Sequence, residues 1–413
     1  MTAVTPNPPD EAVSHLRHTD AMKLLFACAN SASDPHLWSG TVWNSRRALE
    51  SAGVELEVID NIPFECPLHL RILHQFYKRL TKKTHSLQSE PAVLEHAAQQ
   101  IATRFSRGDC QAVFSPGSGV AVHAYIPAKI PVFPYLDATK LSWIRTYFGE
   151  QTLTSRSRHH IDAVDRISLN NATKTFFSSQ WALDEAVRDY GVSAERMAVV
   201  PFGANLVDPP SRTEVDKWIQ DRPRDTLNLL FLGKEWERKG GPEALALVRE
   251  LGRRGLKAVL HIVGCTPQID EADRPLVELH GFINHSRTEG WKTFRPLLAQ
   301  SHALIFLSRA EAYGIALCEA AAFGVPMFAS DTGGIPTIVQ PGVNGWLSPM
   351  PFSASEGASA LQTTFAQPES YQRLADGARL DYENRLNWSA AGTALVQHMH
   401  QALSRRPSSA LTR

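Results

Sequence analysis

The chain has 413 residues, of which 43% are hydrophobic, and its 42 lysines and arginines balance its 42 aspartates and glutamates. This length exceeds what one ordinary hydrophobic core organises and suits two α/β domains. The balanced charge excludes the global basic field that is typical of a nucleic-acid-binding protein, so we expect no nucleic-acid partner.

The cysteines and the N-terminus indicate a compartment. Five cysteines are scattered along the chain without a C-x-x-C pair or a cysteine–histidine cluster at zinc spacing. Residues 1–21 hold prolines and acids where a signal peptide needs a basic start and an apolar core, and no long apolar run follows anywhere. We therefore expect a cytoplasmic protein with reduced thiols.

Strand and helix patterns alternate along the first half of the chain. A polar leader over residues 1–21, expected to be flexible, precedes an apolar run over 22–30 that predicts a buried parallel strand. Helices are predicted over 41–52, 91–106, 118–125 and 181–189, and further strands over 54–60, 111–116, 131–137, 173–179 and 197–203. This alternation predicts a doubly wound domain over residues 22–207.

A segment rich in proline and charge, residues 208–226, is interpreted as a linker. The series then restarts, with strands over 227–233, 257–264, 277–282, 302–308, 326–330 and 345–347 and helices over 241–254 and 287–300. We expect a second Rossmann-like domain over 227–369, helices over 370–403 that can cross back to the first domain, and a disordered tail over 404–413. The predicted fold class is α/β, with two Rossmann-like domains facing each other across a cleft.

The loop after the strand over 227–233 is cationic. It begins at Gly233, which permits a tight turn, and carries Lys234 and Lys239. Parallel sheets bind ligands at the carboxyl ends of their strands, so this loop is suited to a pyrophosphate. A solvated surface loop would have the same composition, and this alternative stays open.

Two glutamates follow the strand over 302–308. Glu311 falls in a loop, and Glu319 falls in a helix that opens at Gly314, where exposed amides and the positive end of the dipole suit a phosphate. As an alternative, Glu311 caps the helix and Glu319 is a surface residue. Glu319 lies in an apolar run, however, where an unpaired buried carboxylate would be costly.

The order F-x-G-K-x4-K-G, S-R-x-E-x-Y-G-x4-E, G-V-P, D-T-G-G-I-P and G-x-N-G resembles the retaining GT-B glycosyltransferases of family 4. Weaker matches at 38–41, 137–139, 177–181 and 200–204 extend the resemblance over nearly the whole chain. The resemblance implies a nucleotide diphosphate sugar, a UDP- or GDP-hexose, as donor. It also implies retention of configuration and a glycan, lipid-linked or small-molecule acceptor, with no cofactor.

The resemblance also implies roles for single residues. Lys239 would contact the donor phosphates, Lys234 stands where an arginine is commoner, and Glu319 would accept hydrogen bonds from the ribose. The implied donor-binding set is Gly40, Gly233, Lys234, Lys239, Tyr313, Gly314, Ile315 and Glu319, and the implied catalytic set is Asp137 and Glu311. The chain departs from the family pattern in having Ala312 for a glycine and Thr337 for a glutamate.

The sequence also bears on a metal site and on two alternative functions. No Asp-x-Asp pair and no H-E-x-x-H motif occurs, so no metal site is expected. A nonhydrolysing nucleotide-sugar epimerase and a catalytically silent GT-B scaffold remain alternatives to a transferase. An assay with the donor as the one substrate distinguishes the epimerase from a transferase. The absence of any stabilisation by nucleotide diphosphates would favour the silent scaffold.

The stretch Leu68–Lys83 is basic and amphipathic. Leu73, Phe76, Tyr77 and Leu80 recur at helical spacing, while the basic residues gather elsewhere on the helical wheel. Such a helix can make peripheral contact with a membrane or a lipid-linked acceptor. The alternative is an ordinary helix that turns its apolar face to the core.

Overall fold

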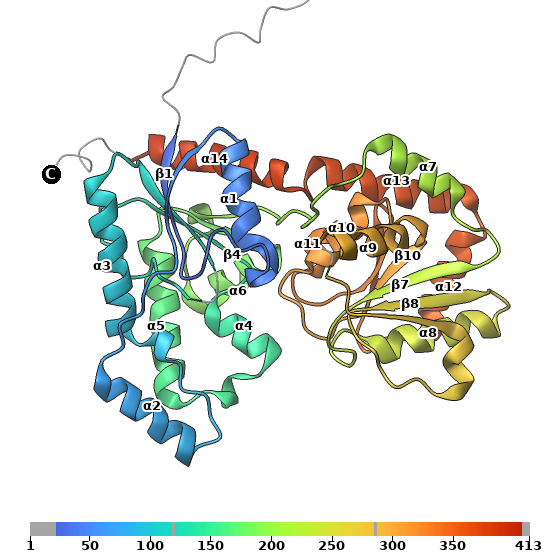
Figure 1. Cartoon of the computed structure of the whole chain (residues 1–413), viewed down its shortest axis with the longest axis horizontal. Helices are drawn as coiled ribbons and strands as arrows, with labels where there is room; N and C mark the ends of the chain where they lie inside the picture. Colours follow the sequence, from blue (N-terminus) through green and yellow to red (C-terminus); the bar gives the residue numbers. More distant parts are fainter. Residues whose placement is uncertain (1–21, 118–119, 285–286, 407–413) are drawn as a thin grey trace, which may run out of the picture.

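The computed structural model describes residues 22–117, 120–284 and 287–406. It has two α/β domains side by side, each built on one parallel sheet (Figure 1). The predictions for the leader over 1–21 and for the tail beyond residue 406 lie outside the described residues. Within the predicted tail, Ser404 is the last residue of a helix, so that helix extends one residue further than predicted.

The N-terminal sheet has the strand order β2-β1-β3-β4-β5-β6. Its strands are β1 (Lys23–Ala27), β2 (Glu55–Ile59), β3 (Ala112–Pro116), β4 (Val132–Leu136), β5 (Thr175–Phe177) and β6 (Met197–Val199). The helices around it are α1 (Thr41–Ser51), α2 (Leu68–Leu80), α3 (Pro91–Arg107), α4 (Lys140–Tyr147), α5 (Ser155–Asn171) and α6 (Gln180–Tyr190). Helices cover both faces, so Phe26 and Phe133 in the central strands are fully buried, as their apolar sequences require.

The C-terminal sheet has the order β12-β11-β10-β7-β8-β9. Its strands are β7 (Leu227–Leu232), β8 (Ala258–Val263), β9 (Val277–Gly281), β10 (Ala303–Phe306), β11 (Met327–Ser330) and β12 (Gly345–Ser348). Its helices are α7 (Arg212–Asp221), α8 (Gly241–Arg253), α9 (Thr288–Gln300), α10 (Ile315–Ala322), α11 (Ile335–Ile338), α12 (Ala354–Phe365) and α13 (Pro368–Asn384), and α14 (Trp388–Ser404) follows them in the chain. Helix α7 lies in the segment interpreted as the linker, where Ser211 and Glu214 form a capping box.

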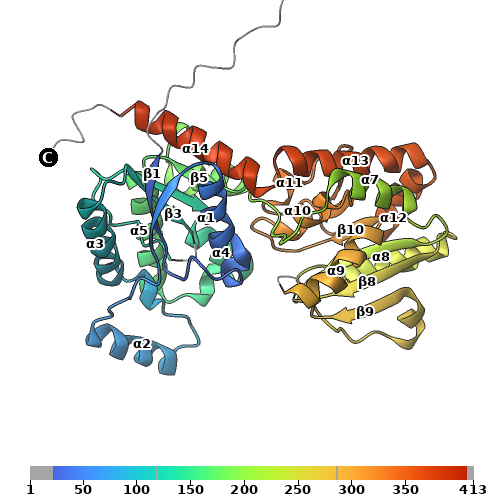
Figure 2. The same ribbon diagram turned by 45° about the horizontal axis from the view of Figure 1, so that its top comes forward.

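The last helix, α14, leaves the C-terminal domain and runs along the N-terminal one (Figures 1 and 2). It packs against α1, and Gly392 lies so close to that helix that a Cβ atom there would be 2.4 Å from the carbonyl oxygen of Ala48. A side chain at position 392 would therefore push the two helices apart. The tight packing ties the C-terminal helices to the N-terminal domain.

The helix predicted over 118–125 is wrong. Among the residues that the structure describes there, 120–126 form a series of turns. Tertiary contacts explain the difference. The ring of His123 lies between the hydroxyls of Ser115 (3.0 Å) and Ser168 (2.6 Å), and these contacts with other elements compete with the local preference for a helix. The strand-and-helix pattern also did not indicate α4 and α5 in the N-terminal domain, or α11 and α12 in the C-terminal one.

Candidate active site between the two domains

The cationic loop after β7 meets the glutamate loop after β10. The side chain of Lys239 is largely buried, and its ammonium group forms an ion pair with the carboxylate of Glu311. The same ammonium lies over the ring of Phe306, 4.6 Å from its centroid. Lys239 and Glu311, assigned to phosphate binding and to the reacting centre by resemblance, are thus brought together at the carboxyl ends of adjacent strands.

The glycine pair Gly333 and Gly334 packs against the backbone of the loop that carries Glu311. The amide of Gly334 donates to the carbonyl oxygen of Glu311 at 3.1 Å. Gly333 has a φ of 55°, and a Cβ atom there would lie 1.9 Å from the same oxygen. Only glycine fits this position, because the conformation is left-handed and the backbones are in contact.

Gly333→Ala is therefore expected to destabilise the protein by roughly 2–4 kcal/mol, since the added methyl group forces the Glu311 loop away. Gly342→Ala is the matched control: its φ is 77°, but nothing lies within 4 Å of the added methyl group. The control should lose only about 1–2 kcal/mol of backbone preference. Urea unfolding measures both, and equal losses in the two variants would show that contact with Glu311 is unimportant.

Tyr147, the last residue of α4, reaches across from the N-terminal domain to the glutamate loop. Its hydroxyl donates to Glu311 Oε1 at 3.4 Å and accepts from the amide of Ala312 at 2.8 Å. The guanidinium of Arg238 lies 5.2 Å from the centroid of its ring. Burial, followed by the charge of Glu311, raises the pKa of this phenol, so it stays a neutral donor.

Asp137 follows β4 and lies near the same loop. Burial, opposed by a hydrogen bond from the side chain of Trp38 and reinforced by the charge of Glu311, raises its pKa to about 6. A carboxyl group perturbed in this way inside a cleft is a common mark of a functional site. Asp137 and Glu311, the two predicted catalytic residues, come from different domains and influence each other electrostatically.

The loop before α1 has an unusual backbone. Trp38, Ser39 and Gly40 have φ values of 47°, 53° and 80°, all in the left-handed region. Such conformations cost about 1–3 kcal/mol each for residues other than glycine, and they persist only where the surroundings hold them. Here the side-chain amides of Asn44 and Asn205 donate to the carbonyl oxygens of Gly40 (3.0 Å) and Ser39 respectively. The loop is thereby held so that Trp38 reaches Asp137.

The remaining predicted donor residues lie around this centre. Gly233 directly follows β7, and its amide donates to the carbonyl oxygen of Val263 at 2.9 Å, so the lysine loop starts next to β8. Lys234 points elsewhere than Lys239, with its ammonium 4.8 Å from the ring centroid of Phe282. The two lysines therefore line different parts of the loop.

Helix α10 begins directly after the glutamate loop. Gly314 is its N-cap with a φ of 103°, Ile315 is its first residue, and Glu319 is buried within it. The side chain of Tyr313 is committed to the domain interface, where its hydroxyl donates to the carbonyl oxygen of Phe202 at 2.7 Å. A donor contact at Tyr313 would therefore come from its backbone.

One departure from the family pattern has a structural use. Thr337 stands where the family often has glutamate, and its hydroxyl accepts a hydrogen bond from the amide of Gln180 at 2.9 Å. That amide opens α6 of the N-terminal domain. Thr337 thus joins the two domains beside the glycine pair.

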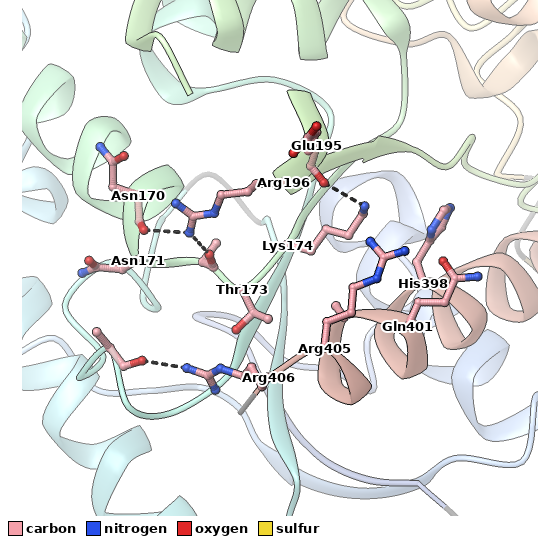
Figure 3. A pocket seen from close by; sticks show the side chains of 13 residues that line it. Asn170, Asn171, Thr173, Lys174, Glu195, Arg196, His398, Gln401, Arg405 and Arg406 are labelled. Carbon is pink, nitrogen blue, oxygen red and sulfur yellow. Dashed lines mark hydrogen bonds between the residues drawn. The ribbon is translucent and has the colours of Figure 1, made fainter. Parts of the chain in front are cut away.

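A separate cavity of about 450 Å³ lies on the far edge of the N-terminal sheet (Figure 3). It is lined by residues that precede β5 and β6, such as Lys174 and Arg196, and by the end of α14. Arg196 donates to the carbonyl oxygen of Asn170 at 2.8 Å, and Arg406 donates to that of Ala128 at 3.0 Å. The cavity is at the amino-terminal ends of these strands and is distinct from the site around Glu311.

Sequence reasoning missed Tyr147 and Arg238 as members of the site. Tyr147 belongs to α4, which the periodicity does not indicate, and Arg238 occupies one of the unspecified positions of the lysine-loop motif. The one available signal was aromatic density, since Trp143, Tyr147 and Phe148 follow closely on Asp137. Their clustering after a strand end is weak evidence without the fold.

Residues 213–381 match the family described as Glycosyl transferases group 1. The chain is similar to a D-inositol 3-phosphate glycosyltransferase of Xylanimonas cellulosilytica, with 30% identity over 253 residues. That match covers 56% of this chain and 57% of the relative, so it spans little more than half of the curated protein.

Two solved structures are similar over nearly the whole chain. Sucrose-phosphate synthase from Thermosynechococcus elongatus has a TM-score of 0.61 at 18% identity, covering 93% of this chain and 100% of that one. Anabaena HepE in complex with UDP has a TM-score of 0.58 at 17% identity, covering 92% and 100%. These likenesses confirm the predicted fold class of two Rossmann-like domains. The chain therefore has the GT-B fold, and its C-terminal domain is similar to the group 1 glycosyltransferases.

Proposed function

We propose that this protein transfers a hexose from a nucleotide diphosphate sugar to an acceptor, with retention of anomeric configuration. The observation that carries the proposal is the buried pair of Lys239 and Glu311, with Asp137 and Tyr147 of the other domain beside it. A cation, a carboxylate and a perturbed carboxyl group from facing domains suit a reaction in which a diphosphate leaves and an acceptor hydroxyl attacks. The acceptor would be a glycan, a lipid-linked molecule or a small molecule.

Charge on the leaving diphosphate would be balanced by the protein. We propose that Lys239 and the amides that open α10 at Gly314 and Ile315 supply positive potential to the diphosphate, and that Lys234 adds charge from another part of the same loop. Preorganised groups of this kind stabilise charge that develops in the transition state. Because the chain has no Asp-x-Asp pair, we propose that transfer proceeds without a divalent metal.

The nucleoside would lie further along the same strand ends. Glu319, buried in the first turns of α10, is proposed to accept hydrogen bonds from the ribose hydroxyls. The glycine loop at Gly40 is proposed to approach the donor phosphates from the other domain. The solved structure of HepE with UDP supports a UDP-hexose as the first donor to test, ahead of a GDP-hexose.

The experiment that tests this function is a thermal-shift panel of UDP-, GDP- and ADP-sugars, followed by incubation of the stabilising donor with candidate acceptors. Binding is expected to raise the melting temperature, because a ligand that binds only the folded state stabilises it. Proton NMR of the product then gives the anomeric configuration. Stabilisation by none of the donors, inversion at the anomeric carbon, or isomerisation of the donor without an acceptor would each contradict the proposal.

Helix α2 is proposed to contact an anionic membrane. Leu68, Ile72, Phe76 and Leu80 are 57–72% exposed and recur every four residues, so they form one apolar stripe in solvent. The expectation that Leu73 and Tyr77 belong to this face is wrong. Both are partly buried, and the ring of Tyr77 lies 5.0 Å from that of His85.

The charge of α2 supports a lipid surface as the partner of the stripe. Residues 68–83 include five lysines and arginines and no acidic residue, so pairing of two copies through this helix would bring like charges together. An anionic lipid surface instead complements both the apolar stripe and the basic residues. No helix among the described residues has the length and apolarity that a membrane span requires.

We expect the protein to sediment with vesicles that contain phosphatidylglycerol and to stay in the supernatant with phosphatidylcholine alone. The double substitution Ile72→Ser and Phe76→Ser should abolish sedimentation, because it removes the centre of the apolar stripe that would be buried in the membrane. Leu380→Ser is the control, since Leu380 is also exposed (52%) but lies on α13. Equal sedimentation of all three proteins would refute the membrane role of α2.

A further inference from the structure

Three side chains that can bind a metal meet on the outer strands of the C-terminal domain. His261 lies in β8, and Glu278 and His280 lie in β9, the edge strand of the sheet (Figure 2). The parallel register sets His261 beside Glu278. Because side chains alternate along a strand, Glu278 and His280 share one face. None of the three belongs to the candidate active site around Lys239 and Glu311.

Their ligand atoms have the spacing of a metal site. His261 Nδ1 is 3.2 Å from His280 Nε2 and 3.2 Å from Glu278 Oε2, and the last two atoms are 3.9 Å apart. Tetrahedral zinc with bonds of about 2.0–2.2 Å holds its ligand atoms roughly 3.3–3.6 Å from one another. Small side-chain rotations therefore bring all three atoms to the coordination distance of one ion.

Hydrogen bonding alone does not account for this arrangement. His261 Nδ1 carries either one hydrogen or one lone pair, so it can bond well to Glu278 or to His280 but not to both. The distance of 3.9 Å between His280 and Glu278 is too long for a hydrogen bond between them. One close contact between electronegative atoms thus remains unpaired in every tautomer, whereas a cation accepts all three lone pairs.

His261 is suited to be a ligand. It is buried between β8 and β9, and a neutral imidazole is the form of histidine that binds a metal. Its Nε2 atom has no hydrogen-bond partner among the described residues, so no donor at Nε2 holds the proton on Nδ1. Glu278 is exposed and His280 partly so, which leaves an open side for an ion to enter and for water to complete the coordination.

We propose that His261, Glu278 and His280 bind one zinc ion, which ties the edge strand β9 to β8. Two imidazoles and a carboxylate form a ligand set typical of zinc and neighbouring transition metals. Phe282 follows His280 by two residues, and the ammonium of Lys234 lies over its ring. The ion would therefore also stabilise that side of the lysine loop. This site is structural and is separate from the transfer reaction, which we propose to be metal-independent.

The test uses untagged, metal-stripped protein titrated with Zn²⁺ by calorimetry and with Co²⁺ by visible absorption. We expect one ion per chain, a raised melting temperature with Zn²⁺, and the absorption of four-coordinate cobalt. His280→Ala and Glu278→Gln, both at accessible positions, should each weaken binding at least tenfold and remove the thermal shift. His96→Ala is the control. His96 forms an exposed pair with Glu65 at 3.8 Å, but among the described residues no third possible ligand joins this pair to make a metal site.

Two results would overturn the metal site: no zinc-dependent rise in melting temperature of the unmodified chain, or equal zinc affinity in His280→Ala and the unmodified chain. Stabilisation by the nucleotide-sugar donor is measured on the same proteins. It should persist in His280→Ala, so that a failure of the zinc site and a failure of the transferase proposal give different results.

Discussion

Lys239→Ala is expected to lower turnover with the nucleotide-sugar donor by roughly 10²–10³-fold, the usual effect of removing one group that stabilises developing charge. The ammonium of Lys239 is largely buried against Glu311 and Phe306, so water cannot replace it at low cost. Lys239→Arg keeps the charge and should lose less. Lys257→Ala is the control, since Lys257 is an exposed lysine of the same domain.

The measurement is initial rate against donor concentration, with and without excess EDTA. We expect EDTA to leave kcat of the unmodified chain unchanged, because the protein's own cations balance the leaving diphosphate. A melting curve of Lys239→Ala checks that Glu311, left without its partner, has not unfolded the domain. A rate that collapses in EDTA and returns with magnesium or manganese in both the unmodified chain and His280→Ala would refute the metal-independent mechanism, and a near-normal rate in folded Lys239→Ala would refute the role of the lysine.

Asp137→Asn is expected to change how both activity and stability depend on pH. Burial and the charge of Glu311 raise the pKa of Asp137 to about 6, while an unfolded aspartic acid releases its proton near pH 3.9. Between these values the folded state binds more protons than the unfolded one. The free energy of unfolding therefore falls as the pH rises through about 4–6, and this loss remains at neutral pH.

An amide does not ionise, so Asp137→Asn should be more stable than the unmodified chain above pH 6, by at most about 3 kcal/mol, and about equally stable near pH 4. Its kcat/KM should be low and should lack the acid limb, with an apparent pKa near 6, that the unmodified chain is expected to show. Urea unfolding and rate profiles from pH 4 to pH 8 measure both, with Asp208→Asn, at an exposed position, as control. An unchanged acid limb in Asp137→Asn would assign that limb to another group.

The position of the site in the fold could be predicted because it depends on chain order. Strands of a parallel sheet all present their carboxyl ends at one edge, so a loop with Lys239 after one strand and a loop with Glu311 after another had to face the same side. The sheet order places β7 directly beside β10, which brings these loops into contact. The motif resemblance then added roles that spacing alone left open.

The amphipathic pattern over residues 68–83 determined a helix but not which of its faces would be covered. Periodicity groups Leu73 and Tyr77 with Phe76 and Leu80 on one broad apolar arc, and it cannot say how much of that arc a neighbour buries. In the structure the neighbour is the segment around His85, which covers Tyr77 and leaves Phe76 in solvent. Only tertiary packing distinguishes the covered Tyr77 from the exposed Phe76.

By itself, the sequence determined the alternation of strands and helices, the two sheets and the loops that carry Lys239 and Glu311, because these follow from local periodicity and from the geometry of parallel sheets. Only the tertiary structure decided that Tyr147 reaches Glu311, that Trp38 reaches Asp137 through a left-handed loop, and that His261 meets β9. The physical reason is the same in each case. These contacts join side chains far apart in the chain, or depend on backbone conformations that only surrounding residues stabilise, so no local pattern records them.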